Sequence, residues 1–393
     1  MHIPLSERMH LIKPSPTLVI AAYAGKLKKE GKDIVALGVG EPDFDTPQFI
    51  KEAAISAILE GYTKYTPTEG MPELKNAIIE KLKRDNHLDY KPSQVMASTG
   101  GKQCIFNLAQ VLLNPQDEVI IPTPYWVSYP DIVHLAGALP VYIKTNITES
   151  YKITPTQLDA AMTEKTRLIF INSPSNPSGK AYTPNELKAL AEVLEKHPNI
   201  IIATDDMYEK ILWGQNTFTN ILNVCPALYE RTVIINAVSK TYAMTGWRLG
   251  YAAGPDALIQ AMIDLQSHST SHPTSISQKA AIAALQGDQS VVHEHKDIFQ
   301  KRHQYVYERL THMRGIQVIP ADGTFYIFPD VSSIIRAKGF ANDLEFATQL
   351  LEQTGVALVP GSAFGCEGSI RISFATSDEN LKKALDRIEA FIS

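Results

Sequence analysis

The chain has 393 residues, of which 44% are hydrophobic and 20% charged, and its formal net charge at pH 7 is −5. This composition is typical of a globular protein and lacks the basic excess that binds a phosphate backbone, so we expect no nucleic-acid partner. There is neither an apolar run of ~18 residues nor a signal-peptide pattern, which predicts a cytoplasmic protein without a membrane partner. Cys104, Cys225 and Cys366 lie far apart in the sequence, so we expect free thiols and no metal site.

Short apolar runs alternate with helical patterns through the middle of the chain. The segment 183–198 begins with Thr-Pro and has leucines at helical spacing, which predicts a helix. Continuous apolar runs separated by helices are typical of a largely parallel sheet covered on both faces. We therefore predict an α/β fold with a mostly parallel seven-stranded sheet between helices. Its strands are expected within 94–101, 117–125, 139–145, 167–174, 199–208, 232–240 and 249–255.

The pattern changes after residue 286. A long charged helix is predicted over 290–315 and another helix over 341–355, with short strands around them. This mixture favours a second, smaller α+β domain. The first forty or so residues lack the α/β alternation and are expected to pack with the C-terminal part. The predicted domains are accordingly a large one over 48–286 and a small one made of 1–47 and 287–393.

Polar residues follow several of the predicted strands, where ligands bind in open α/β sheets. Gly100, Gly101 and Lys102 follow the first strand and open a helix, so their amides predict an anion site that suits a phosphate. A nucleotide P-loop is excluded because it needs Gly at position 96 and Ser or Thr at 103, where the chain has Met96 and Gln103. The other strand ends carry Trp126, Asn176, Asp205, Tyr208, Ser239 and Lys240.

Together these groups suggest a flat, cationic, phosphorylated cofactor, and pyridoxal 5'-phosphate fits that description. Lys240 can form an imine with an aldehyde, which removes the cost of burying an ammonium and provides a later general base. Asp205 beneath the ring nitrogen would keep that nitrogen protonated. Ser239 and Arg248 would add a hydroxyl and a bidentate cation to the phosphate. Asp206 is expected to face the other way, because side chains alternate along an extended segment.

Seven motifs occur in one order along the chain: "YTPTEGMPELK", "TGGKQ", "PTPYWVSYP", "NSPSNPSG", "DDMYEK", "SKTYAMTGWRLGYAAGP" and "GSIRISFA". In this order and approximate spacing the chain resembles the class I aminotransferases of the aspartate aminotransferase family, from "LGVGEPDF" to "RISFA". The resemblance implies a fold type I pyridoxal phosphate enzyme and a homodimer with shared active sites. It also implies ping-pong transfer of an amino group from an amino acid, most simply aspartate, to 2-oxoglutarate.

The resemblance implies a role for each candidate residue. Lys240 would bind the cofactor covalently, with Asp205 on the pyridine nitrogen. Tyr208 and Asn176 would donate to the phenolic oxygen, and Trp126 would stack on the ring. The implied phosphate-binding residues are Gly100, Gly101, Lys102, Ser239 and Arg248, together with Tyr65 from the neighbouring subunit.

The expected substrate contacts are Gly40, Lys102, Trp126, Asn176 and Arg371. Arg371 would bind the substrate α-carboxylate, with Gly40 opposite it. Two features depart from the better-known family members. Ala237 replaces a hydroxyl that often contacts the phosphate, and the segment 266–277 offers no arginine for a distal carboxylate. In a subgroup with the "TGGKQ" motif the lysine takes over that role, which makes Lys102 the candidate for the side-chain carboxylate.

The cofactor residues serve several reactions on one scaffold, so other activities stay open. These are an aromatic or kynurenine-type aminotransferase, a prephenate aminotransferase and a pyridoxal phosphate-dependent carbon–sulfur lyase. Lys102 favours an acidic substrate among them. The effector domain of a transcription regulator is disfavoured, because only about 35 residues without a basic stretch precede "LGVGEPDF".

Overall fold

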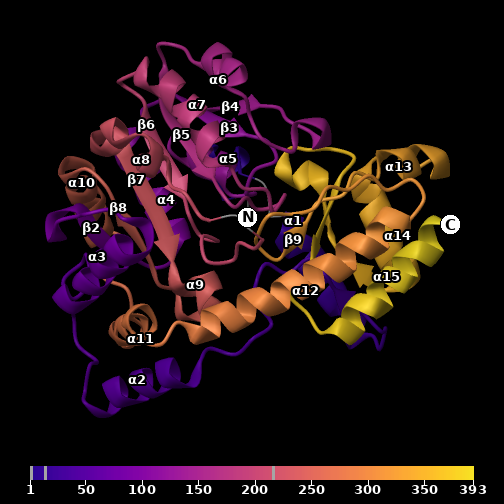
Figure 1. The fold of residues 1–393 in the computed structure, drawn as a ribbon, viewed down its shortest axis with the longest axis horizontal. Helices are drawn as coiled ribbons and strands as arrows, with labels where there is room; N and C mark the ends of the chain where they lie inside the picture. The colour runs from indigo at the N-terminus through magenta and orange to yellow at the C-terminus, as the bar shows by residue number, and fades with distance from the viewer. Residues whose placement is uncertain (1–2, 13–15, 215–216) are drawn as a thin grey trace.

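The computed structural model describes residues 3–12, 16–214 and 217–393. Its centre is a seven-stranded sheet with the strand order β2-β8-β7-β6-β5-β3-β4 (Figure 1). β8 runs antiparallel to both of its neighbours, and the other strands pair in parallel. The predicted α/β fold with a mostly parallel sheet is therefore confirmed. The strands are β2 (Val95–Ser98), β3 (Glu118–Pro122), β4 (Leu139–Ile143), β5 (Thr166–Asn172), β6 (Ile201–Asp205), β7 (Thr232–Ala237) and β8 (Gly250–Ala253).

Helices cover both faces of this sheet. In β5 the side chains of Leu168 and Phe170 join one buried apolar cluster, and those of Ile169 and Ile171 join another. A strand with two apolar faces needs cover on both sides, which explains its continuous hydrophobic run. The covering helices are α3 (Pro72–Asn86), α4 (Gly101–Leu112), α5 (Tyr129–Leu135), α6 (Pro155–Ala161), α7 (Pro184–Glu195), α8 (Ile221–Val224), α10 (Asp256–Ser267) and α11 (Ser275–Gln286).

The predicted helix after residue 183 is α7, and it begins with a reciprocal cap. The Thr183 hydroxyl accepts a hydrogen bond from the Glu186 amide, and the Glu186 carboxylate accepts one from the Thr183 amide. This capping box satisfies two backbone donors that a helix start leaves free.

The C-terminal part forms a smaller α+β unit beside the large sheet (Figure 1). Its three-stranded antiparallel sheet has the order β11-β12-β9. The N-terminal segment joins it, because β1 (Val35–Ala36) pairs in parallel with β10 (Val356–Ala357). The other elements of this unit are α1 (Pro16–Lys29), α12 (Ser290–His312), β9 (Tyr326–Ile327), α13 (Ser332–Lys338), α14 (Asp343–Thr354), β11 (Val359–Pro360), β12 (Ile370–Ser373) and α15 (Asp378–Ile392).

The domain boundaries remain a proposal: 48–286 for the large domain, and 1–47 with 287–393 for the small one. Separate hydrophobic clusters support the division: one packs on each face of the large sheet, and another lies beneath α12 to α15. Residues 1–2, 13–15 and 215–216 of these ranges lie outside the described residues. Further elements are α2 (Gln48–Leu59), α9 (Val238–Thr241) and short 3-10 helices at Glu7–His10, Pro92–Gln94, Ile147–Glu149, Pro226–Arg231, Thr245–Trp247 and Gly361–Phe364.

Within the described ranges, no helix combines the length and apolar character needed to cross a membrane. The same residues contain no group of three or more His, Cys, Asp or Glu side chains that could hold a metal ion. The three cysteines are free thiols.

His303 on α12 gives the stability of the fold a pH dependence. Its ring is buried beside Trp213, and its Nε2 accepts a hydrogen bond from the Ala321 amide at 2.9 Å. Burial lowers the pKa of His303 to about 4, whereas the unfolded chain titrates near ~6.5. The unfolded state therefore takes up the proton first, and stability present above ~6.5 is lost as the pH falls toward ~4, by up to about 3 kcal/mol.

We expect His303→Gln, which keeps an acceptor but cannot titrate, to flatten the decrease in Tm between pH 7 and pH 4.5. Thermal unfolding followed by circular dichroism measures this decrease. His312→Gln on the exposed last turn of the same helix is the matched control and should keep the wild-type slope. An unchanged slope in His303→Gln would show that another group governs the acid sensitivity.

Candidate active site

A cavity of about 310 Å³ opens at the carboxyl ends of the large sheet's parallel strands, where the smaller unit meets it. Residues from both units line it. The structure brings together these predicted site residues: Gly40, Gly101, Lys102, Trp126, Asn176, Asp205, Tyr208, Ser239, Lys240, Arg248 and Arg371. The cavity is also lined by residues that sequence reasoning missed, namely Thr17, Ile105, Val127, Ser128, Asn172, Met207 and Tyr326.

Lys240 lies just beyond β7, in the short helix α9. The buried strand carries the lysine to the cavity wall, where its Nζ donates a hydrogen bond to the Gly40 carbonyl at 2.6 Å. Burial lowers the pKa of Lys240 to about 8, and the positive charges of Arg248 and Arg371 act in the same direction. The amine therefore loses its proton more readily than that of an exposed lysine, which suits it to act as a nucleophile or base.

Asp205 ends β6 with its carboxyl group facing the cavity. Its Oδ2 accepts a hydrogen bond from the Tyr129 hydroxyl at 2.6 Å, and its Oδ1 is buried with no partner among the described residues. Burial raises the pKa of Asp205 to about 6, and the Tyr129 hydrogen bond opposes that rise. Asp206 follows the strand and is not part of the cavity lining, and its Oδ2 accepts a hydrogen bond from Nδ2 of Asn220 at 2.7 Å. The site thus holds a buried carboxyl oxygen that a cationic N–H group would satisfy.

The turn before α4 forms a tight anion cradle. Gly100 has a φ of 86°, and a Cβ atom there would lie 2.4 Å from Nη2 of Arg248. Gly250 is equally constrained, because its Cβ would lie 2.3 Å from the Gly101 amide nitrogen. Arg248 is held by a 2.8 Å hydrogen bond from its Nη1 to the Thr245 carbonyl. A guanidinium beside the N-terminus of a helix suits a phosphate.

Arg371 on β12 is only 3% exposed. Its Nη1 donates to Oδ1 of Asn176 and its Nη2 to the Gly38 carbonyl, both at 2.8 Å, while its Nε has no partner among the described residues. The guanidinium lies over the ring of Tyr326, 4.3 Å from the centroid, and the Tyr326 and Tyr208 hydroxyls are 3.1 Å apart. Burial lowers the pKa of Arg371, but a guanidinium stays protonated. It can therefore bind a carboxylate.

Lys102 and Trp126 lie together in the cavity lining. Nζ of Lys102 lies 5.0 Å from the centroid of the Trp126 ring. The Lys102 side chain is exposed overall, yet partial desolvation of its ammonium lowers its pKa, with a further contribution from Arg248. Unlike the predicted site residues that line the cavity, Tyr65 does not line the cavity of its own chain, and its side chain is 92% exposed.

The sequence model of the class I and II aminotransferases matches residues 32–388. The chain belongs to this family. It is 53% identical to the aspartate/prephenate aminotransferase of Nitrosomonas europaea, over 99% of this chain and 100% of that protein. It is 48% identical to the aspartate aminotransferase of Bacillus subtilis, over 99% of this chain and 98% of the relative.

Solved structures of aminotransferases agree with this assignment. The aspartate aminotransferase of Rhizobium meliloti superimposes with a TM-score of 0.95 at 44% identity, over 100% of this chain and 99% of that one. The Thermus thermophilus aspartate aminotransferase with maleate superimposes with a TM-score of 0.93 at 40% identity, over 99% and 100% of the two chains. The fold type I architecture is thereby confirmed.

Aminotransferases of this family depend on pyridoxal phosphate, and the residues present fit that cofactor. The unpartnered Oδ1 of Asp205 suits a protonated ring nitrogen. The cradle of Gly100, Gly101 and Arg248 suits the phosphate. The buried amine of Lys240 suits the aldehyde.

Tyr129 and Tyr326 are the functional neighbours that sequence reasoning missed. Tyr129 opens α5, three positions after Trp126, and Tyr326 lies in the two-residue strand β9. Neither carries a local signal that separates it from an ordinary core tyrosine. Only the tertiary contacts with Asp205 and Tyr208 identify them.

Proposed function

We propose that this aminotransferase transfers the amino group of aspartate to 2-oxoglutarate. The observation that carries the proposal is a pair of cationic groups, the guanidinium of Arg371 and the ammonium of Lys102, in the lining of the cavity that holds Lys240. Two cations suit a dicarboxylic amino acid better than an apolar one. The Thermus thermophilus neighbour, solved with maleate, is a relative seen with a dicarboxylate.

The proposed cofactor contacts follow from the lining of the cavity. Asp205 would hold the proton on the ring nitrogen, Tyr208 and Asn176 would donate to the phenolic oxygen, and Trp126 would cover the ring. Phosphate contacts would come from the amides of Gly101 and Lys102 and the side chains of Ser239 and Arg248. When bound, the cofactor supplies an aldehyde that accepts the amino group and a ring that delocalises the electrons of the substrate carbanion.

The remaining residues of the proposed site act on the substrate itself. Arg371 would bind the α-carboxylate opposite Gly40, and Lys102 would bind the side-chain carboxylate. Two fixed carboxylates would orient the Cα–H bond toward Nζ of Lys240, which would take the proton. A pKa of about 8 suits Lys240 to this work near neutral pH.

Prephenate is the second candidate acceptor. The relative from Nitrosomonas europaea is named an aspartate/prephenate aminotransferase, and so is that from Cereibacter sphaeroides at 50% identity. Prephenate also carries two carboxylates, so the same pair of cations suits it. Steady-state assays with aspartate as the donor measure kcat/KM for prephenate and for 2-oxoglutarate separately. Turnover with both acceptors would show that the enzyme uses two, and turnover with one would identify which.

We expect Lys102→Ala to lower kcat/KM for aspartate by about 10- to 100-fold, because a charge-assisted contact with the side-chain carboxylate is lost. An aromatic amino donor has no such carboxylate, so its kcat/KM should change by less than about threefold. Lys102→Arg, which keeps the charge, should retain most of the preference for aspartate. Equal losses for both donors would contradict the role of Lys102 in specificity and place its effect on the cofactor.

A homodimer with shared active sites completes the proposal. The exposed apolar side chains of Ile55, Ile58 and Leu59 on α2, the last 82% exposed, support such an interface. α2 lies against α11 at the edge of the large domain (Figure 1). Tyr65 follows α2 in the chain, and its high exposure suits a contact with the phosphate of the neighbouring subunit. Free thiols suit the cytoplasmic location that is part of the same proposal.

A subunit-mixing experiment tests the shared site. Tyr65→Ala and Lys240→Ala are each expected to be impaired alone. Equal amounts dissociated and reassociated together should recover about a quarter of wild-type activity, because each mixed dimer then has one site with an intact lysine and an intact partner tyrosine. Recovery no better than the average of the two separate variants would argue that Tyr65 does not act across an interface.

A further inference from the structure

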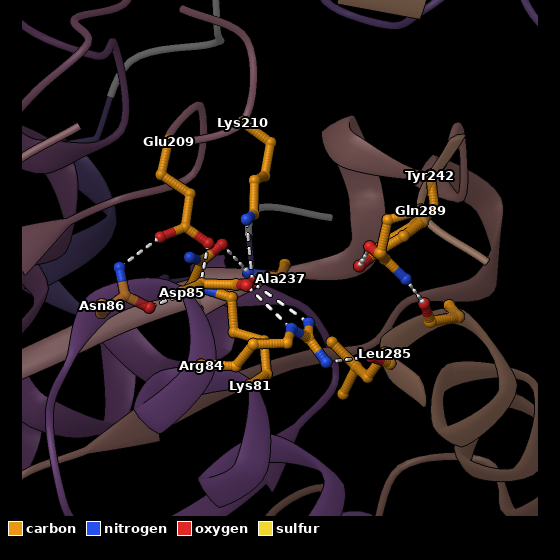
Figure 2. A network of polar contacts seen from close by, with 12 residues as sticks. Lys81, Arg84, Asp85, Asn86, Glu209, Lys210, Ala237, Tyr242, Leu285 and Gln289 are labelled. Carbon is orange, nitrogen blue, oxygen red and sulfur yellow. Dashed lines mark hydrogen bonds and ion pairs between the residues drawn. The ribbon is translucent and has the colours of Figure 1, made fainter. Parts of the chain in front are cut away.

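A buried network of charged side chains joins α3 to the loop after β6, which also carries Tyr208 (Figure 2). Lys81 on α3 is 2% exposed and Glu209 is 6% exposed. Nζ of Lys81 contacts Oε1 of Glu209 and donates to Oδ1 of Asn86 at 2.7 Å. Nδ2 of Asn86 donates to Oε2 of Glu209 at 2.7 Å. The three side chains thus form a closed triangle in which both carboxylate oxygens are occupied.

The next residue of the loop is fastened to the same helix. Nζ of Lys210 lies 2.9 Å from Oδ2 of Asp85, and the Asp85 carboxylate also forms an ion pair with Arg84 (Figure 2). Two consecutive loop residues, Glu209 and Lys210, are therefore ion-paired with the last turns of α3. Lys81 and Asp85 are four residues apart, so they share one face of that helix.

The other flank of Tyr208 is fixed in a similar way. Asp206 accepts a hydrogen bond from Nδ2 of Asn220, and its amide donates to the Ile235 carbonyl at 2.9 Å. Between these two anchors, Met207 and Tyr208 are the residues that line the cavity. Among the residues that the structure describes, the Tyr208 hydroxyl forms one hydrogen bond, with the hydroxyl of Tyr326 in the smaller unit. Within the large sheet's own unit, the side chains of residues 206 and 209 therefore anchor the segment that carries the phenol on both sides.

A buried ion pair is a poor device for stability alone, because apolar side chains of similar size often serve as well or better. A buried ion pair does restrict conformation, because a charge that moves away from its partner stays buried without compensation, at a large desolvation cost. An anchor of this kind fixes the loop in one conformation. The pair adjoins the residue whose hydroxyl must meet the cofactor, which is where such a constraint matters for chemistry.

We propose that Lys81 is a positioning residue of this aminotransferase, which acts through Glu209 to hold the Tyr208 hydroxyl at the cofactor's phenolic oxygen. The inference rests on the role proposed above for Tyr208. Lys81 does not line the cavity that holds Lys240, so its effect on the chemistry must pass through the loop. Loss of Lys81 leaves Asn86 as the one hydrogen-bond partner of the Glu209 carboxylate among the described residues. The carboxylate must then take up a proton or move toward water, and either change removes the charged anchor of the loop.

The test uses the pH titration of the visible absorbance of the bound cofactor in the purified holoenzyme. The midpoint is the pH at which half of the bound cofactor has lost its proton. A phenol that donates a hydrogen bond to the cofactor's anionic oxygen stabilises the deprotonated form and so lowers this midpoint. Tyr208→Phe should therefore raise the midpoint by about one unit, and Lys81→Met should raise it by about half a unit or more. Lys83→Met, on the exposed face of the same helix, should keep the wild-type midpoint.

Kinetics give a second readout. Lys81→Met should lower kcat by about tenfold while the KM for aspartate stays within about twofold, because the substrate carboxylates are bound elsewhere. Should Lys81→Met not fold, Glu209→Gln is measured in the same way, since it keeps the side-chain size and the contact with Asn86. It is expected to raise the midpoint as well.

The outcomes separate the two claims. A raised midpoint in Tyr208→Phe and in Lys81→Met or Glu209→Gln supports the inference. A raised midpoint in Tyr208→Phe alone, with the pair variants at the wild-type value, overturns the role of Lys81 and leaves that of Tyr208 intact. An unmoved midpoint in Tyr208→Phe overturns the proposed role of Tyr208 and the inference with it.

Discussion

Lys240→Ala is expected to lower kcat with aspartate and 2-oxoglutarate by about 10⁴-fold or more. The variant removes the amine proposed to take the proton from the substrate Cα, and positioned general bases alone contribute about 10²–10⁴-fold. It also removes the nucleophile proposed to bind the cofactor's aldehyde. Steady-state kinetics on purified protein measure the loss, with the amount of bound cofactor determined for each sample.

The cofactor should stay bound in Lys240→Ala, because the cradle at Gly100 and Arg248 and the carboxyl group of Asp205 are unchanged. Its absorbance spectrum should differ from that of the wild type, since no covalent bond to the protein can form. Lys83→Ala is the matched control and should keep full activity. Wild-type turnover in Lys240→Ala would refute the role of this lysine.

Arg371→Leu is expected to lower kcat/KM for aspartate by about 10²–10³-fold. The α-carboxylate would lose a buried, bidentate partner, and truncation of such a contact costs about 2–5 kcal/mol. Most of the loss should fall on KM, because the contact is made in the bound ground state as well as in the transition state. The loss should extend to every amino donor, since all of them share the α-carboxylate.

Arg371→Lys separates charge from geometry. It keeps the cation but lacks the planar fork that meets a carboxylate at two atoms, so its kcat/KM should lie between those of the wild type and Arg371→Leu. Circular dichroism checks that the loss of contacts to Asn176 and the Gly38 carbonyl has not unfolded the chain. A wild-type KM for aspartate in Arg371→Leu would mean that another group binds the α-carboxylate.

The parts of the site that could be predicted from the sequence are those with a local chemical signature. Lys240 stands at the end of an apolar strand, where an ammonium is costly, and Gly100 precedes a helix start. Asp205 ends another buried strand. At each of these positions a polar residue or a glycine follows a run of apolar residues that predicts a buried strand. Because parallel strands end at the same edge of the sheet, these residues are expected to lie close together. The α/β fold follows from the same apolar runs.

The parts that could not be predicted depend on contacts between distant segments. Tyr129 meets Asp205 across 76 positions of sequence, and Lys81 meets Glu209 across 128. In the sequence, Tyr129 is indistinguishable from an ordinary core tyrosine. Because few lysines are fully buried, nothing in the sequence distinguishes Lys81 from a solvated lysine of a helix. Only the packing of α3 beneath the loop after β6 gives it a buried partner.

The most direct test of the central claim is the visible absorbance of purified holoenzyme during addition of aspartate without an acceptor, followed by 2-oxoglutarate. We predict that aspartate removes the absorbance band of the bound cofactor as the amino group is transferred to it, and that 2-oxoglutarate restores the band. Each half of the reaction is thereby observed separately. A cofactor band that aspartate leaves unchanged would contradict aspartate as the amino donor and, with it, the role of Lys102.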